Sequence, residues 1–181
     1  MKESKLYFIT GSSGIGKSTI IPILKSNFMN EFDIHDFDEK LTEEVAMNRS
    51  LLDAWRKETT AYWIEQAVRN KKDGKSTLVV GLIYPSEVVK MNTDISISFC
   101  LLDASDEKIR ERLMGKRFST PERIAGLKQA TGQTPEEFIE KNKNTLDRLR
   151  QEVKKVNGFV IDTTNDTPNG TAIKIIFWIK S

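Results

Sequence analysis

The sequence is poor in cysteine, in histidine and in long apolar runs. Its 181 residues include one cysteine, Cys100, and one histidine, His35. A single cysteine cannot form a disulfide within the chain, so we expect Cys100 to be a buried, reduced thiol in a cytoplasmic protein. The apolar stretches Ile95–Leu102 and Ile173–Ile179 are far shorter than a membrane span. We therefore expect neither a membrane segment nor a signal peptide.

A strong net charge is also absent. Lysine and arginine number 28 and the acidic residues 26, so the formal net charge is +2. This balance provides no general attraction to nucleic acid or to membranes, and neither is expected as a partner. The chain is 38% hydrophobic and 30% charged, which is typical of a soluble globular protein. Its length predicts a single domain over residues 1–181, and the choice between a monomer and a homodimer stays open.

Short apolar runs alternate with longer segments of helical pattern. Five strands are predicted, at Leu6–Ile9, Phe32–Ile34, Leu78–Ile83, Ile95–Leu102 and Phe159–Ile161. Helices are predicted at Ser18–Asn27, Ser50–Asn70, Ser105–Arg117, Pro135–Val156 and Thr167–Lys180. Strands joined by helices indicate an α/β fold with a parallel sheet, whose ligands bind at the carboxyl ends of the strands. The weak periodicity of Phe118–Gln133 predicts a mobile loop or lid.

The segment after the first strand matches the phosphate-binding pattern G-x-x-x-x-G-K-[ST] at every fixed position. It reads Gly11-Ser12-Ser13-Gly14-Ile15-Gly16-Lys17-Ser18 and is followed by Thr19. Glycines let successive backbone N–H groups point at a phosphate, and the start of the next helix adds a favourable field. Lys17 is expected to contact the β- and γ-phosphates, and the Ser18 hydroxyl to bind Mg²⁺. Residues 11–19 are thus predicted to hold ATP or GTP.

Two carboxylates, Asp36 and Asp38, follow the second predicted strand. Either can take a proton from a substrate hydroxyl, hold magnesium or cap a helix. We assign Asp36 to catalysis, substrate and metal, and Asp38 to substrate; His35 is interpreted as structural. The third strand lacks the aspartate that many P-loop proteins use for magnesium, which gives Asp36 more weight. Gly81 in that strand indicates either a close approach to ligand or a strand irregularity.

Arginines flank the predicted lid. Planar guanidinium groups stabilise the charge that develops in phosphoryl transfer, although basic residues on helices more often form a solvated surface. We assign Arg117 to catalysis. Arg148 and Arg150 lie about 200° apart on one helix, so only one can face the site, and Arg148 is favoured. Arg56 is interpreted as a substrate contact or a surface residue.

The chain resembles the nucleoside and nucleotide kinase-like group of P-loop kinases, which includes adenylate, shikimate and gluconate kinases. The resemblance covers nearly the whole length. It rests on Gly11–Ser18, His35-Asp36-Phe37-Asp38, Leu102-Asp103-Ala104-Ser105 with Arg112-Leu113 and Arg117, and Val160–Thr164. It implies a three-layer P-loop NTPase fold with sheet order 2-3-1-4-5, a lid near 118–133 and an acceptor-binding region near 38–70. Small bacterial AAA-family or P-loop kinase-like proteins are similar too, and their acceptor is often unassigned.

The resemblance also implies roles for single residues. Arg112 would stack on adenine, and the turn that contains Thr163 would border it. Lys116 stands where adenylate kinases have a phosphate-binding arginine, with Arg117 next to it, so either residue can contact the γ-phosphate. The segment Gly81–Pro85 lacks the aspartate and the arginine that adenylate kinases carry there, which argues against a standard nucleoside monophosphate acceptor.

These patterns predict an ATP- and Mg²⁺-dependent kinase that acts on a small metabolite. One alternative is a nucleotide-binding switch or slow ATPase, and another is a phosphotransferase that modifies an antibiotic hydroxyl. A guanine-reading Asn-Lys-x-Asp motif would favour a switch. Asn70-Lys71-Lys72-Asp73 has this spacing, but it begins at the end of a predicted helix, so we do not interpret it as a guanine site. The acceptor and the choice between ATP and GTP stay open.

Overall fold

The computed structural model describes residues 4–181, apart from the side chains of Met47 and Arg49. Five parallel strands form one sheet in the order β2-β3-β1-β4-β5. They are β1 (Leu6–Thr10), β2 (Phe32–Asp36), β3 (Ser76–Gly81), β4 (Ile97–Asp103) and β5 (Phe159–Asp162). The predicted α/β class and the strand order are confirmed.

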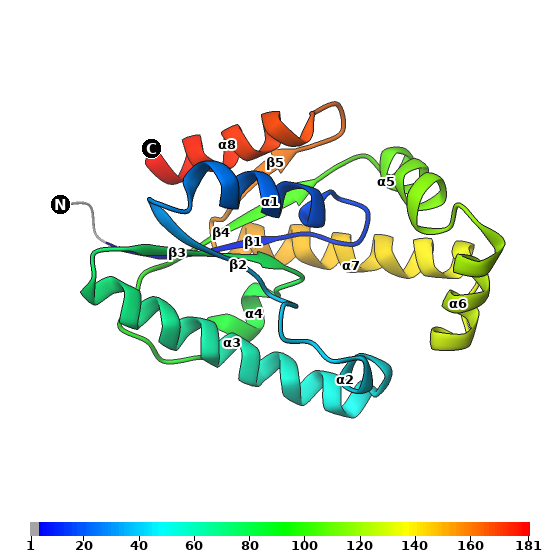
Figure 1. The fold of residues 1–181 in the computed structure, drawn as a ribbon, viewed down its shortest axis with the longest axis horizontal. Coiled ribbons are helices and arrows are strands. Elements are labelled where there is room, and N and C mark those ends of the chain that lie inside the picture. The colour runs from blue at the N-terminus through cyan, green and yellow to red at the C-terminus, as the bar shows by residue number, and fades with distance from the viewer. Residues whose placement is uncertain (1–3) are drawn as a thin grey trace.

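Helices cover both faces of the sheet, which gives three layers (Figure 1). One face carries α1 (Lys17–Phe28) and α8 (Pro168–Lys180), and the other carries α3 (Arg49–Lys72), α4 (Pro85–Val88) and α7 (Pro135–Lys155). Beyond the carboxyl ends of the strands lie α2 (Glu43–Met47), α5 (Asp106–Arg112) and α6 (Pro121–Thr131). Within residues 4–181, every helix is too short or too polar to cross a bilayer.

The central strand shows why the sheet needs both helical layers. All five residues of β1 are buried, and successive side chains point to opposite faces. Tyr7 and Ile9 pack in the cluster that includes α1 and α8, whereas Leu6 and Phe8 pack with Trp63 of α3. The predicted buried thiol is confirmed as well: Cys100 in β4 is fully buried, and burial raises its pKa.

Two segments differ from the sequence prediction. Residues 118–133 are mostly helical rather than a loop, because Thr120 caps the first turn of α6 and Gly132 ends the helix in the left-handed conformation. Leu127 is the one buried residue of α6, so the sequence of this helix has little apolar periodicity from which it could be predicted. The predicted helix Ser105–Arg117 divides into α5 and a π-helical turn, η1 (Leu113–Arg117). The short helices α2 and α4 were not predicted.

Candidate active site

The glycine-rich loop joins the end of β1 to the start of α1. Gly14 and Gly16 have φ values of 79° and 108°, which residues with a side chain rarely adopt. The backbone N–H groups of Gly14, Ile15 and Gly16 have no protein acceptor within residues 4–181. These N–H groups and the N-terminus of α1 are the donor set that a phosphate requires. The residues present therefore fit a nucleotide phosphate.

Lys17 lies folded back over this loop. Its Nζ donates to the carbonyl oxygens of Gly11 and Ser12, at 2.7 Å each. The pKa of Lys17 is lowered to about 8, mainly by burial; Asp38 and Asp36 raise this pKa, and Arg117 lowers it. Desolvation thus disfavours the charged ammonium relative to the neutral amine, and an incoming phosphate would favour the ammonium again.

Asp36 and Asp38 are held by a turn at the end of β2. The N–H of Phe37 donates to the carbonyl of Val80 at 2.9 Å, and the N–H of Asp38 donates to Oδ1 of Asp36 at 3.0 Å. The chain therefore turns instead of staying extended, yet both carboxylates still reach the same cavity. Partial desolvation and the charge of Asp36 raise the pKa of Asp38, whereas Lys17 and Arg56 lower it; the residue itself is exposed at the mouth of the cavity.

The loop and the carboxylates share a cavity of about 850 Å³ with the basic end of α5 and η1. We call it the P-loop cavity. Its lining includes Ser13, Gly14, Ile15, Gly16, Lys17, Ser18, Thr19, Asp36, Asp38, Arg112, Lys116, Arg117, Arg123 and Thr163. The structure thus brings together most of the residues that the sequence predicts for nucleotide, metal and catalysis.

Arg112 ties the cavity wall together. Its guanidinium donates to the hydroxyl of Thr163 at 3.1 Å and to the carbonyl of Thr163 at 2.6 Å. The same group reaches the carbonyl of Ile15 at 3.5 Å. The two residues predicted to border adenine are therefore in direct contact, at the junction of α5, the glycine-rich loop and the turn after β5.

The π-helical turn η1 sets the position of Arg117. The N–H of Phe118 donates to the carbonyl of Leu113 at 2.9 Å, the i→i+5 bond of a π-helix. This wider turn accommodates one more residue than an α-helical turn. Arg117 stacks on Phe138 with 4.8 Å between its Cζ and the ring centroid, and its charge acts on Lys17. Lys116 and Arg117 both line the cavity, and the charge of Arg117 lowers the pKa of Lys17.

Gly11 and Ser12 of the glycine-rich loop do not line the P-loop cavity, and three further predicted site residues also lie outside it. Arg148 stacks on Tyr84 at 3.7 Å and pairs with Glu152 at 2.7 Å. Arg56 lies near the same ring, at 5.3 Å, and donates to the carbonyl of Leu82 at 2.7 Å. We call Arg56, Tyr84 and Arg148 the Tyr84 stack; it follows β3 and adjoins Asp38 through the charge of Arg56.

The third of these residues, Gly81, has a packing reason to be glycine. A Cβ at Gly81 would lie 2.3 Å from the Cβ of Phe37, so any side chain there would displace the turn that holds the two carboxylates. His35, interpreted as structural, stacks on Trp63 with 4.3 Å between ring centroids and pairs with Asp33 and Glu39.

Sequence reasoning missed Asn142 of α7. Its side chain is 6% exposed and bonds the glycine-rich loop at Ser12 and Ser13. The available signal was a polar residue in register with Leu146, Leu149 and Val153, the buried positions of the same helix. A polar side chain on an apolar helix face needs a buried partner.

A magnesium ion also fits the oxygen donors of the cavity. Mg²⁺ is usually bound by one or two carboxylates or hydroxyls together with substrate phosphates and water. The Ser18 hydroxyl and the Asp36 carboxylate, both predicted as metal ligands, line the cavity. The described part of the chain holds no cluster of three or more His, Cys, Asp or Glu side chains suited to a metal, so the phosphates would have to complete the site.

Comparison with known proteins defines the fold. No protein-family model matches the chain, and a search of curated proteins finds no match. A sugar kinase from Janibacter sp. HTCC2649 matches with a TM-score of 0.64 at 18% identity, over 98% of this chain and 95% of that one. Shikimate kinase from Acinetobacter baumannii, in complex with shikimate, gives 0.61 at 15%, over 98% and 93%. A gluconokinase from Sinorhizobium meliloti 1021 gives 0.58 at 16%, over 100% and 99%. The chain therefore has the P-loop nucleoside and nucleotide kinase-like fold.

Proposed function

We propose that the protein transfers the γ-phosphate of ATP to a hydroxyl or phosphate group of a small molecule. One observation carries the proposal: Lys17, Asp36, Asp38 and Arg117 converge on the cavity of the glycine-rich loop. A cation at the loop, a carboxylate and a guanidinium that line one cavity are what phosphoryl transfer requires. The kinases that share the fold support this proposal.

In this mechanism the loop N–H groups bind the phosphates, and Lys17 leaves its carbonyl partners to contact the β- and γ-phosphates. We assign the proton of the acceptor hydroxyl to Asp38, whose pKa is raised, in place of Asp36, which would hold magnesium. The acceptor oxygen then bonds to the γ-phosphorus, the bond to the bridging oxygen breaks, and ADP leaves with that electron pair. Arg117 stabilises the charge on the migrating group. Magnesium held by Ser18 and Asp36 would neutralise the phosphates.

The acceptor would bind beside Asp38, between α3 and α7. The Tyr84 stack lies there and presents an aromatic face with two guanidinium groups, Arg56 and Arg148. Arg148 is then an acceptor contact rather than a γ-phosphate contact, and residues 38–70 provide one wall of the acceptor region. Glu87 and Glu152 partly neutralise the two arginines, at 3.6 and 2.7 Å.

Helix α6 is the proposed lid of this single domain. It is almost entirely exposed, and Arg123 brings its first turn to the cavity. Closure of residues 118–133 over the nucleotide would exclude water and suppress hydrolysis of ATP.

A coupled assay of ADP release tests the function. Wild-type protein is given ATP and Mg²⁺ with panels of nucleosides, nucleotides, sugar acids and hydroxyl-rich antibiotics, and the products are identified by mass spectrometry. We expect acceptor-dependent ADP release and a phosphorylated product, both abolished by Lys17→Ala and retained by Lys155→Ala, a change at an exposed residue in the last turn of α7. ADP release that no acceptor stimulates would instead favour the slow ATPase or switch. Full activity in Lys17→Ala would contradict both.

A further inference from the structure

One side chain of α7 reaches across the molecule to the glycine-rich loop. Oδ1 of Asn142 accepts a hydrogen bond from the N–H of Ser13 at 2.8 Å. Its Nδ2 donates to the carbonyl of Ser13 at 3.0 Å and to the hydroxyl of Ser12 at 3.3 Å. The amide thus bonds both the N–H and the carbonyl of Ser13, although Asn142 and Ser13 are 129 positions apart in the chain.

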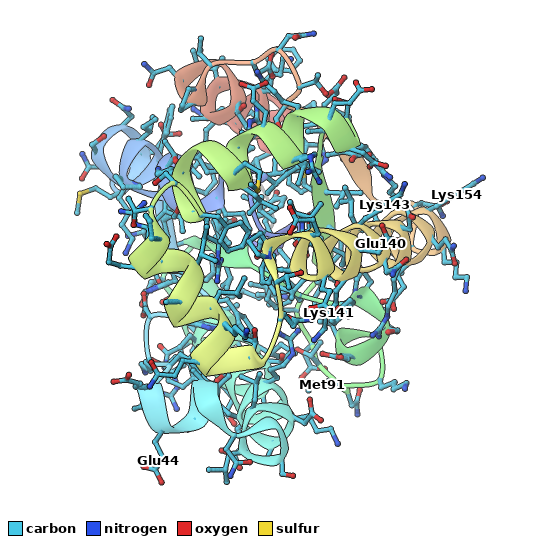
Figure 2. The ribbon with its side chains drawn as sticks, turned by 90° about the vertical axis from the view of Figure 1, so that its right-hand side faces the viewer. Glu44, Met91, Glu140, Lys141, Lys143 and Lys154 are labelled. Atoms are coloured by element: carbon cyan, nitrogen blue, oxygen red, sulfur yellow. The ribbon has the colours of Figure 1, made fainter. Side chains whose placement is uncertain are left out.

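The contact is buried and firmly supported. Asn142 is 6% exposed, Ser12 is fully buried, and the neighbours Lys141 and Lys143 are exposed on the outside of α7 (Figure 2). The helix is anchored two turns further on, where Arg150 makes a forked contact with Asp103 of β4 at 2.7 and 2.9 Å. α7 therefore presents the amide from a fixed base rather than from a mobile surface.

The choice of loop atoms indicates what the contact does. Asn142 occupies the N–H of Ser13, whereas the N–H groups of the next three residues, Gly14 to Gly16, have no acceptor within the described chain. A loop with two residues in the left-handed conformation has several alternative backbone arrangements. Fixing both polar groups of Ser13 selects the arrangement in which the following N–H groups converge.

We propose that Asn142 is a positioning residue that pre-organises the glycine-rich loop for the β-phosphate of a nucleotide. This rests on the proposed function, since the loop must bind a nucleotide for its arrangement to matter. Pre-organisation lowers the ordering cost of binding. Because α7 directly follows α6, the same contact connects the phosphate loop to the helix that carries the lid.

Binding of ADP and of AMP, measured by isothermal titration calorimetry with Mg²⁺, tests the proposal. The variants are Asn142→Ala and Asn142→Ser, with Asn144→Ala as a matched control, because Asn144 lies two residues away and is exposed. Asn142→Ser is uncharged and keeps a polar group but loses the paired donor and acceptor of the amide, so it carries the test if Asn142→Ala fails to fold. Circular dichroism monitors folding.

We expect both Asn142 variants to weaken ADP binding about 10- to 100-fold, the size of loss that unpaired buried polar groups produce. The affinity for AMP, which lacks the β-phosphate, should stay within about twofold, and Asn144→Ala should match the wild type. An equal loss for ADP and AMP would indicate general damage and overturn the positioning role. Unchanged ADP binding in folded Asn142 variants would overturn it too. Failure of the wild type to prefer ADP over AMP would instead overturn the proposed function.

Discussion

The carboxylate of Asp38 and the ammonium of Lys17 shift each other's pKa. Among the charges around Lys17, Asp38 raises its pKa most, and Lys17 in turn lowers the pKa of Asp38. Asp38 lies in the turn after β2, Lys17 is the first residue of α1, and both line the P-loop cavity. The pair therefore spans the space in which an acceptor would meet the γ-phosphate.

Replacing this carboxylate should slow catalysis without loss of nucleotide binding. We expect Asp38→Asn to lower kcat about 10²- to 10⁴-fold, the usual contribution of a general base, with little change in ADP affinity. Asp36→Asn should lower kcat and also weaken the Mg²⁺ dependence, because Asp36 is the proposed metal ligand. Steady-state kinetics over a Mg²⁺ titration separates the two, with the exposed Asp73→Asn as control. Equal, metal-independent losses in both variants would contradict the division of roles.

The pH dependence should report the raised pKa of Asp38. Partial desolvation and the charge of Asp36 favour its protonated form, and a protonated carboxyl cannot take the proton of the acceptor hydroxyl. kcat/KM should therefore rise with pH through the pKa of Asp38, and Asp38→Asn should remove this acidic limb. An identical acidic limb in Asp38→Asn would assign the titration to another group.

ADP binding should weaken as the pH rises above about 8. The pKa of Lys17 is lowered to about 8 in the nucleotide-free protein, so the ammonium is present below that pH and is lost above it. Phosphate oxygens favour the charged form, so binding above pH 8 should take up a proton. Calorimetry in buffers of different ionisation enthalpy measures this uptake directly. Binding without proton uptake at pH 8.5 would contradict the placement of Lys17 against the phosphates.

Arg117 and Lys116 should differ in their effect on turnover. The π-helical turn places Arg117 on Phe138 and near Lys17, so Arg117→Ala should lower kcat about 10²- to 10³-fold, as loss of a donor to transition-state charge does. Lys116→Ala should have the smaller effect and act mainly on the KM for ATP. The reverse order of effects on kcat would assign the γ-phosphate contact to Lys116.

Gly81→Ala should destabilise the fold by about 1–3 kcal/mol, the usual cost of overpacking. The added Cβ would lie 2.3 Å from the Cβ of Phe37. Gly126→Ala is the matched control, because nothing lies within 4 Å of its added Cβ and alanine favours the helix. Thermal unfolding of the two variants measures the difference. A Gly81→Ala protein as stable as the wild type, with weaker ATP binding, would restore the ligand-contact interpretation.

The sequence was informative where a local pattern determines the structure. A buried strand requires apolar residues and a phosphate-binding loop requires glycines at fixed positions. Leu6–Ile9 and Gly11–Ser18 meet these requirements, so the strand and the loop could be predicted from the local sequence. Arg148 could not be placed in this way, because its partner Tyr84 is 64 residues away in the chain. The helix pattern alone does not distinguish an arginine that stacks on Tyr84 from one that faces the phosphates. The role of Asn142 could not be predicted for the same reason, since its partners lie in the glycine-rich loop near the N-terminus. The helix α6 was missed because its exposed face leaves little periodicity to detect.

Transfer of a labelled phosphate tests the central claim most directly. Wild-type protein is incubated with Mg²⁺, ATP labelled in the γ-phosphate and the acceptor panel, and labelled organic phosphates are separated from inorganic phosphate. The account predicts label in an organic product with the wild type and with Lys155→Ala, and none with Lys17→Ala. Label that stays in ATP, or that appears only as inorganic phosphate with every acceptor, would contradict it.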